Sequence, residues 1–295
     1  MTIAPDDERP RLADAPGASA AVTFAFADPR TRVFATARLG LTAEGASGLV
    51  VLFSGGEVAG VRAEAAPAPS AGAGWDAVRV AGLTTTVAEP LEAWTLRGEG
   101  EEFALDLRFE ARSRPAVLPP DRPAATLGGL EGYEQLCAVQ GSVTTAGTRR
   151  DVRCLGQRGH SWGAPDWERM SLSRMLTAWM AEDRALSLVA VRPAKARGHA
   201  EELVDCTLLE GGPPAEPVPV ADPRLSTAYD AEGRMRRAGL ELWLDDDDAA
   251  ARRGAGEVLC GTSLDLGRLQ LHTSFFSWRI DGRPGVGRYD VLRRL

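Results

Sequence analysis

Apolar and polar residues alternate along much of this chain with a period of two. The clearest case lies between residues 103 and 109, where large apolar residues alternate with small or charged ones: Phe103, Leu105, Leu107 and Phe109. The same alternation recurs at residues 22–26, 94–96, 152–154, 186–188 and 240–244. Successive side chains of a strand point to opposite faces, so this pattern predicts strands with one buried face.

Turn signals separate these segments at intervals of roughly ten residues, which is typical of antiparallel hairpins. They include Asp28-Pro29, Ala146-Gly147 and Asp281-Gly282. We expect about nine strands before residue 163 and about seven or eight after it, because that is how many such segments the pattern contains. Residues 166–182 fit a helix or a strand, and we favour a strand. Alternating strand and helix units are not visible, so the predicted fold class is all-β and antiparallel.

The length of 295 residues fits one large domain or two of ordinary size. We place two domains at residues 1–163 and 164–295, with the boundary anywhere between residues 115 and 165. A proline-rich stretch at residues 114–123 is the reason for that range.

Charge and composition exclude several function classes. The net charge is −7, which disfavours a nucleic-acid partner. Lys195 is the only lysine, and the residue directly before it is not a glycine, so a GxxxxGK phosphate loop is impossible. No apolar run approaches the ~20 residues of a transmembrane segment. Residues 1–17 are charged and lack an apolar signal core, so we expect a cytoplasmic protein.

Metal and cofactor sites are not expected. The three histidines are His160, His199 and His272, and no two of them have metal-ligand spacing. The four cysteines are widely separated and fit buried small hydrophobes. We therefore predict no metal and no cofactor, and the oligomeric state is left open.

Residues 159–163, Gly-His-Ser-Trp-Gly, match the GxSxG elbow of α/β-hydrolases. That elbow needs an apolar strand before Ser161 and a helix after it. Here Gln157 and Arg158 precede the pattern, and Ala164-Pro165 follow it. The hydrolase is therefore the least favoured alternative.

The wider segment, residues 156–167, gathers His160, Asp166, Arg158, Trp162 and Trp167 within twelve positions. An imidazole and a carboxyl would provide proton transfer, and tryptophan faces would shape an apolar pocket. We predict His160 and Asp166 as catalytic residues, with the other three binding substrate. The alternative is a structural corner in which Arg158 pairs with Asp166.

A second cluster, Glu131, Tyr133 and Glu134, begins the strand that precedes residues 149–155. In a hairpin turning near residues 146–147, this cluster would lie beside residues 157–160. We therefore add Glu134 to the predicted catalytic residues, and Glu131 and Tyr133 to those that bind substrate.

A third cluster lies near the C-terminal end. His272, Phe276 and Trp278 share one face of a strand and are predicted to bind substrate. The alternative is that His272 is a core histidine whose hydrogen bonds are satisfied by its neighbours.

Several segments in this order resemble a known superfamily: residues 89–94, 103–109, 132–134, 156–167 and 281–287. The chain is similar to bacterial relatives of hydroxyneurosporene synthase (carotenoid 1,2-hydratase) and AttH-like proteins that carry an Arg-Asp-His-Ser-Trp-Gly signature. Here Gly159 replaces the acid of that signature, and Asp166 is the nearest substitute.

The resemblance implies two lipocalin-like antiparallel β-barrels packed together, a hydrophobic small-molecule partner, and metal-free chemistry on alkenes. It favours a cofactor-free lyase (hydratase) or cyclase/isomerase acting on an isoprenoid- or polyketide-like molecule in secondary metabolism. A buried acid, Asp166 or Glu134, would act with His160. The alternatives are a non-catalytic lipocalin-type carrier and a pericyclase of the Diels–Alderase kind.

Overall fold

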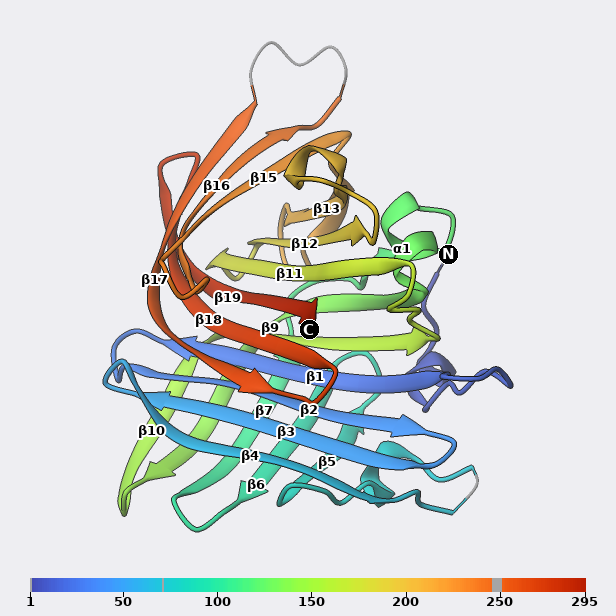
Figure 1. Cartoon of the computed structure of the whole chain (residues 1–295). Coiled ribbons are helices and arrows are strands. Elements are labelled where there is room, and N and C mark those ends of the chain that lie inside the picture. The colour runs from blue at the N-terminus through green and yellow to red at the C-terminus, as the bar shows by residue number, and fades with distance from the viewer. Residues whose placement is uncertain (1, 71, 246–250) are drawn as a thin grey trace. The chain divides into compact units, whose positions relative to one another are not determined.

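A computed structural model describes residues 2–70, 72–245 and 251–295 of the chain. The chain divides into two compact units. Unit 1 comprises Met1–Pro119 and Leu130–Pro165, and unit 2 comprises Pro120–Gly129 and Asp166–Leu295. Each unit is built on one curled antiparallel sheet, so the fold is all-β with two lipocalin-like half-barrels, as predicted (Figure 1).

The sheet of unit 1 has ten strands among the described residues, in the order β4-β3-β2-β1-β10-β9-β7-β6-β5, with β8 paired to β9. The first strand therefore pairs with the last. The strands are β1 (Ser19–Asp28), β2 (Val33–Thr42), β3 (Gly45–Ser54), β4 (Glu57–Pro67), β5 (Leu83–Glu89), β6 (Ala93–Glu99), β7 (Phe103–Ala111), β8 (Ala116–Leu118), β9 (Leu130–Thr145) and β10 (Thr148–Gly163). Two short 3-10 turns, η1 (Pro5–Glu8) and η2 (Trp75–Ala77), complete the unit.

The period-two pattern explains the packing of this sheet. In β7 the four predicted apolar positions are all buried, while Asp106 between them is exposed. The predicted turn is confirmed as well, since Thr145 pairs with Thr148 across Ala146-Gly147. Both turn residues have positive φ values, 47° and 74°, which a two-residue hairpin turn requires.

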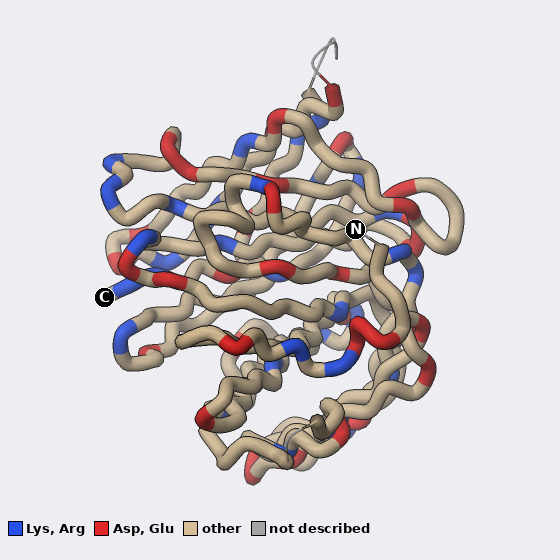
Figure 2. Tube along the Cα trace, turned by 90° about the vertical axis from the view of Figure 1, so that its right-hand side faces the viewer, with Lys and Arg blue, Asp and Glu red and all other residues tan. Residues whose placement is uncertain are grey.

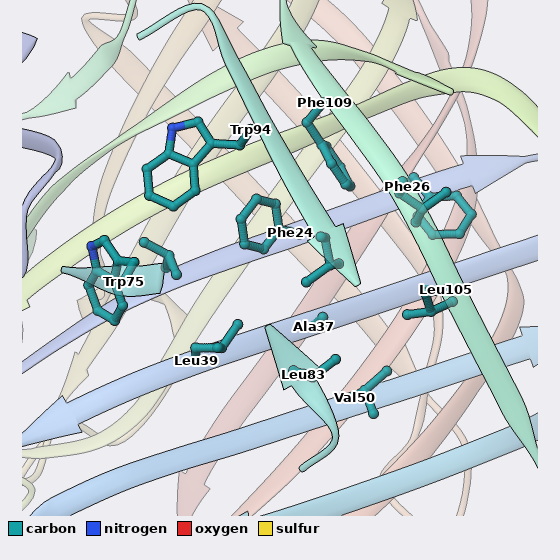
Figure 3. Close-up of a cluster of buried hydrophobic side chains, with 14 of the residues drawn as sticks. Phe24, Phe26, Ala37, Leu39, Val50, Trp75, Leu83, Trp94, Leu105 and Phe109 are labelled. Atoms are coloured by element: carbon teal, nitrogen blue, oxygen red, sulfur yellow. The ribbon is translucent and has the colours of Figure 1, made fainter. Parts of the chain in front are cut away.

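Aromatic side chains fill the interior of unit 1. Figure 3 shows Phe24 between Trp94 and Phe109, and the ring centroids lie 5.9 and 5.1 Å away, respectively. Trp75 also joins this cluster from η2 (Figure 3). Burial of such large apolar surfaces is the main source of stability in a β-barrel of this kind.

β4 and β5 are the two edge strands of the unit 1 sheet. Polar contacts join β4 to residues that lie next to β5. Arg62 in β4 donates to the carbonyl of Glu99 at 3.1 Å. The Glu64 carboxylate accepts the backbone N–H of Ala81 at 3.1 Å. These contacts close the curled sheet without a continuous backbone ladder.

The sheet of unit 2 has nine strands among the described residues, in the order β14-β13-β12-β11-β19-β18-β17-β16-β15. Its first strand also pairs with its last. The strands are β11 (Met170–Ala181), β12 (Arg184–Pro193), β13 (Leu203–Glu210), β14 (Glu216–Pro219), β15 (Asp222–Tyr229), β16 (Met235–Trp243), β17 (Arg252–Asp265), β18 (Leu269–Ile280) and β19 (Arg283–Arg294). The unit also contains α1 (Pro123–Gly128) and the 3-10 turn η3 (His199–Glu201).

The segment that fitted helix or strand is the strand β11. Its buried residues alternate from Met170 through Leu172 and Arg174 to Leu176, which is the period of a strand. The interior of unit 2 is a second apolar cluster that includes Phe276, Trp278 and Tyr289.

Charged residues of both signs are spread over the two units and are separated by longer uncharged stretches (Figure 2). The helices among the described residues are too short to span a bilayer.

Candidate functional site

The hairpin of β9 and β10 brings two of the predicted clusters together in unit 1. Tyr133 lies opposite His160, and Glu131 lies opposite Trp162. The predicted proximity of these two segments is therefore confirmed. Because side chains alternate between faces, His160, Tyr133 and Trp162 all point to the apolar interior of unit 1.

A buried ion pair lies on the same interior face. The Arg158 guanidinium contacts the carboxylate of Glu8, with Nη1 and Oε1 2.7 Å apart, and both side chains are almost completely buried. Arg158 also donates to the Tyr133 hydroxyl at 3.3 Å and contacts the side-chain oxygen of Gln135. Its guanidinium lies 4.9 Å from the Trp94 ring centroid, at cation–π distance.

Glu8 reaches this position because η1 turns the N-terminal segment, starting at Pro5, into the interior. Its carboxylate accepts the backbone N–H of Leu91 at 2.8 Å and the indole N–H of Trp94 at 3.0 Å. The Tyr133 hydroxyl lies 3.3 Å from the same carboxylate. A buried carboxylate is stable only when it is paired and hydrogen-bonded in this way.

His160 is surrounded by three aromatic rings that we call the His160 cage: Trp75, Tyr133 and Trp162. Their centroids lie 5.5, 5.8 and 5.4 Å from the imidazole, respectively, and each ring meets it edge-on. Only 1% of His160 is exposed, and neither ring nitrogen has a hydrogen-bond partner among the residues that the structure describes. Buried polar groups are nearly always hydrogen-bonded, so this histidine is an exception that calls for a functional explanation.

The electrostatics of the cage keep the imidazole neutral. Burial, followed by the positive charges of Arg158 and Arg11, lowers the pKa of His160 to about 3. Burial also raises the pKa of Tyr133 to about 12, so its hydroxyl stays protonated. Arg11 lies over the Trp162 ring at 4.5 Å and is itself paired with Asp7.

Glu134 lies on the other face of this hairpin. It pairs with Gly159, and a Cβ atom built on Gly159 would clash with both carboxylate oxygens of Glu134. The carboxyl of Glu134 thus fills the space that a side chain at position 159 would occupy. Gln157 donates to the same carboxylate at 2.5 Å.

Asp166 and Trp167 belong to unit 2. Asp166 is exposed, and its carboxylate accepts the backbone N–H of Glu168 at 2.9 Å, which caps the turn before β11. Trp167 packs on a small apolar cluster formed by Ala124, Met170 and Val191. Arg158, which the corner hypothesis paired with Asp166, is paired with Glu8 instead.

The GxSxG pattern does not form a nucleophile elbow. Ser161 lies within the strand β10, opposite Gly132, and the strand continues to Gly163. A hydrolase elbow is a sharp turn between a strand and a helix, so the required context is missing.

The C-terminal cluster lies inside unit 2. His272 is buried, and both of its nitrogens have partners: Ser263 Oγ at 2.6 Å and Gln270 Oε1 at 2.9 Å. Phe276 and Trp278 stack with centroids 5.6 Å apart in the apolar core. The three side chains share one face as predicted, and the hydrogen bonds of His272 are those of a satisfied core histidine.

A second buried arginine lies near this core. Arg174 of β11 is fully buried and contacts Glu202 at 3.0 Å and the Tyr289 hydroxyl at 3.1 Å. Glu202 also pairs with Arg192 at 2.6 Å and with the partly exposed His199 at 3.0 Å. Both this network and that of Arg158 combine a buried arginine, a glutamate carboxylate and a tyrosine hydroxyl.

Three interior residues of the unit 1 site were not predicted from the sequence: Glu8, Trp75 and Trp94. The sequence signal for Trp75 is a lone tryptophan in a loop rich in glycine and alanine. Glu8 carries no such signal, because it lies in a run of charged residues that is typical of a solvated terminus. Among the described residues, no three His, Cys, Asp or Glu side chains are placed to hold a metal ion.

Solved structures with the same fold cover nearly the whole chain. An AttH-like protein from Nitrosomonas europaea has a TM-score of 0.69 at 12% identity, covering 96% of this chain and 97% of that one. CghA, which has also been solved with Sch210972, has a TM-score of 0.67 at 12% identity, covering 95% and 89% of the two chains. Kievitone hydratase from Nectria haematococca has a TM-score of 0.61 at 11% identity, covering 94% and 88%. These likenesses confirm the AttH-like fold, while the hydroxyneurosporene synthase branch stays a prediction.

No curated protein matches the chain by sequence. One protein family, described as "Domain of unknown function (DUF7064)", matches residues 4–294. The chain therefore belongs to the DUF7064 family.

Proposed function

We propose that this member of the DUF7064 family is a cofactor-free enzyme that acts on an apolar, isoprenoid- or polyketide-like molecule by hydration, cyclisation or isomerisation. The observation that carries the proposal is the His160 cage. A neutral imidazole, with two nitrogens that have no partner among the described residues, lies among three aromatic rings, and the neighbouring Arg158 is already paired with Glu8. Such a group offers one hydrogen-bond donor and one acceptor to a bound molecule.

Fold likeness supports the same class of chemistry by analogy. One neighbour is named a hydratase for the small molecule kievitone, and another has been solved with Sch210972. We extend from them only the idea of an organic small-molecule substrate, and we place its reacting part against His160.

The test is turnover by the full chain on a panel of isoprenoid and polyketide alkenes in water, followed by liquid chromatography and mass spectrometry. Hydration adds the mass of one water, whereas cyclisation and isomerisation change retention at constant mass. We expect His160→Phe to lower turnover at least about 100-fold, the usual contribution of a catalytic side chain of this kind. Ser161→Ala is the matched control, since Ser161 is the next residue on β10 and faces the other way.

Two further variants test the carboxyls predicted from the sequence. Glu134→Gln and Asp166→Asn remove the acids without a large change in shape, and a loss of turnover would assign a role to either one. Equal turnover in wild type and His160→Phe would contradict the proposal. Binding of panel compounds without any product would favour the lipocalin-type carrier.

A further inference from the structure

Trp75 carries a second unpartnered polar group in the His160 cage. Its indole N–H is buried, has no hydrogen-bond partner in the part of the chain that the structure describes, and belongs to the ring that meets His160 edge-on, with centroids 5.5 Å apart. An indole nitrogen can only donate, and a neutral imidazole has one N–H. A carbonyl oxygen has two lone pairs, so one such atom can accept a hydrogen bond from each of these two N–H groups at about 2.9 Å.

The charges around the cage decide what kind of oxygen fits. Arg158 lies on the same face of β10 as His160, two residues away, and Arg11 lies over the Trp162 ring. Both positive charges act on the imidazole. A substrate cation would be repelled here, whereas electron density that shifts onto an oxygen atom would be stabilised.

A full anion fits less well than a neutral oxygen. Arg158 already holds Glu8 and Arg11 already holds Asp7, so a buried carboxylate would find no free counter-charge. Burying an unpaired charge is costly, while a carbonyl oxygen needs only hydrogen-bond donors.

We propose that the Trp75 and His160 N–H groups together bind the carbonyl oxygen of a conjugated ketone, which makes Trp75 a further substrate-positioning residue. This rests on the proposed function, because it assigns the substrate class of the same site. In this role His160 acts as a neutral hydrogen-bond donor that polarises the carbonyl, a use of neutral histidine known from other enzymes.

The test compares two probes, trans-chalcone and 1,3-diphenylpropene, which differ in that the carbonyl group of the first is a methylene group in the second, by isothermal titration calorimetry with the full chain. We expect the ketone to bind at least about tenfold more tightly, the equivalent of two modest hydrogen bonds. Trp75→Phe and His160→Phe should each reduce this preference about 3-fold or more, and the bound carbonyl stretch should return toward its free frequency in infrared spectra.

Trp243→Phe is the matched control, because the indole N–H of Trp243 is also buried without a partner among the described residues, but Trp243 lies in β16 of unit 2. Its preference for the ketone should equal that of the wild type. Equal binding of the two probes, or an equal effect of Trp243→Phe and Trp75→Phe, would overturn the inference. Turnover without a preference for the ketone would support the proposed enzymatic function and contradict the carbonyl-binding site. A preference that depends on Trp75 and His160, without turnover, would support the carbonyl-binding site and contradict the enzymatic function.

Discussion

The interiors of the two units solve the same electrostatic problem in different ways. In unit 1, Arg158 pairs with Glu8 at 2.7 Å, and in unit 2, Arg174 pairs with Glu202 at 3.0 Å. Each arginine also donates to a buried tyrosine hydroxyl, and each glutamate comes from a short 3-10 turn or the residue after it. Both carboxylates are almost completely buried, but Glu202 also pairs with Arg192 and His199, which are partly exposed, so only the unit 2 network is linked to water.

The two arginines do not occupy equivalent strands. By strand order, β10 corresponds to β19 and β1 to β11, yet Arg158 lies in β10 and Arg174 in β11. Shared topology therefore does not explain the likeness. A buried arginine inside a curled sheet needs a carboxylate and a hydroxyl, and each unit supplies them from whichever segment is near.

The histidines show the functional side of the same comparison. His272 has a partner on each nitrogen, whereas His160 has none. A satisfied histidine contributes to stability through its hydrogen bonds. An unsatisfied one keeps its hydrogen-bonding capacity for a ligand at some cost to the fold, which is typical of functional sites.

The largest expected effect comes from removing the acceptor of unit 1. Glu8→Leu should lower the free energy of unfolding by about 3–5 kcal/mol, because it leaves Arg158 buried without a counter-charge and orphans the Leu91 and Trp94 N–H groups. Glu202→Leu should cost less, since Arg192 and His199 reach water. Urea denaturation gives the totals, and hydrogen–deuterium exchange of β10 and β11 assigns each loss to its unit.

A double variant sharpens this result. Glu8→Leu combined with Arg158→Met replaces the whole pair by apolar groups and should recover most of the loss. If Glu8→Leu and Glu202→Leu lower the free energy of unfolding equally, the proposed difference between the buried Glu8 network and the Glu202 network, which is linked to water, is wrong.

The next effect is a dependence of stability on pH. The unfolded chain protonates His160 near pH 6.5, but the folded chain does so only near its pKa of about 3. Below pH 6.5 the unfolded state binds more protons, so stability is lost as the pH falls toward 3. Between pH 7 and 4.5 this histidine should account for about 2–3 kcal/mol.

The measurement is urea denaturation at both pH values for the wild type, His160→Phe and His272→Phe. His160→Phe should flatten the dependence, and His272→Phe should leave most of it, because burial and Arg293 lower the pKa of His272 while the Asp230 carboxylate opposes them. A slope that survives His160→Phe would mean that other groups cause it.

The smallest effect separates the two histidines at neutral pH. His272→Phe should cost about 1–3 kcal/mol, because it removes the hydrogen bond with Ser263 and one of the two to the Gln270 side-chain oxygen, which keeps that from Arg293. His160→Phe should change stability by less than about 1 kcal/mol, because it replaces an unsatisfied ring by an apolar one of similar shape. Thermal unfolding at pH 7 compares them directly, and equal losses would show that His160 is as integrated into the fold as His272.

Local pattern predicted much of the fold. The strands β7, β10 and β11 and the turn at Ala146-Gly147 follow from alternation and turn chemistry, which depend on neighbouring residues only. The same reasoning placed Tyr133 beside His160. It did not assign side chains to the two faces of the hairpin. Because side chains alternate, Glu134 points to the other face of the sheet from His160.

Long-range partners escaped prediction for a physical reason. Glu8 is buried only because Arg158, far along the chain, offers a counter-charge, and no local pattern encodes that pair. Trp75 joins the cage through a turn between β4 and β5, whose position depends on how the whole sheet curls. The groups that complete the candidate site are thus the ones whose positions depend on contacts between distant parts of the chain.

The pairing of first and last strands has a consequence for the order in which the protein can assemble during synthesis. β1 must find β10, so unit 1 stays incomplete until residue 163 has left the ribosome, although its first strand emerges early. Until then Glu8 has no buried cation to join and remains in water. Pairings of such high sequence separation are slow to form. The segment that carries Glu8 is therefore made well before its partner strand β10 and is among the last parts of unit 1 to become fixed in position.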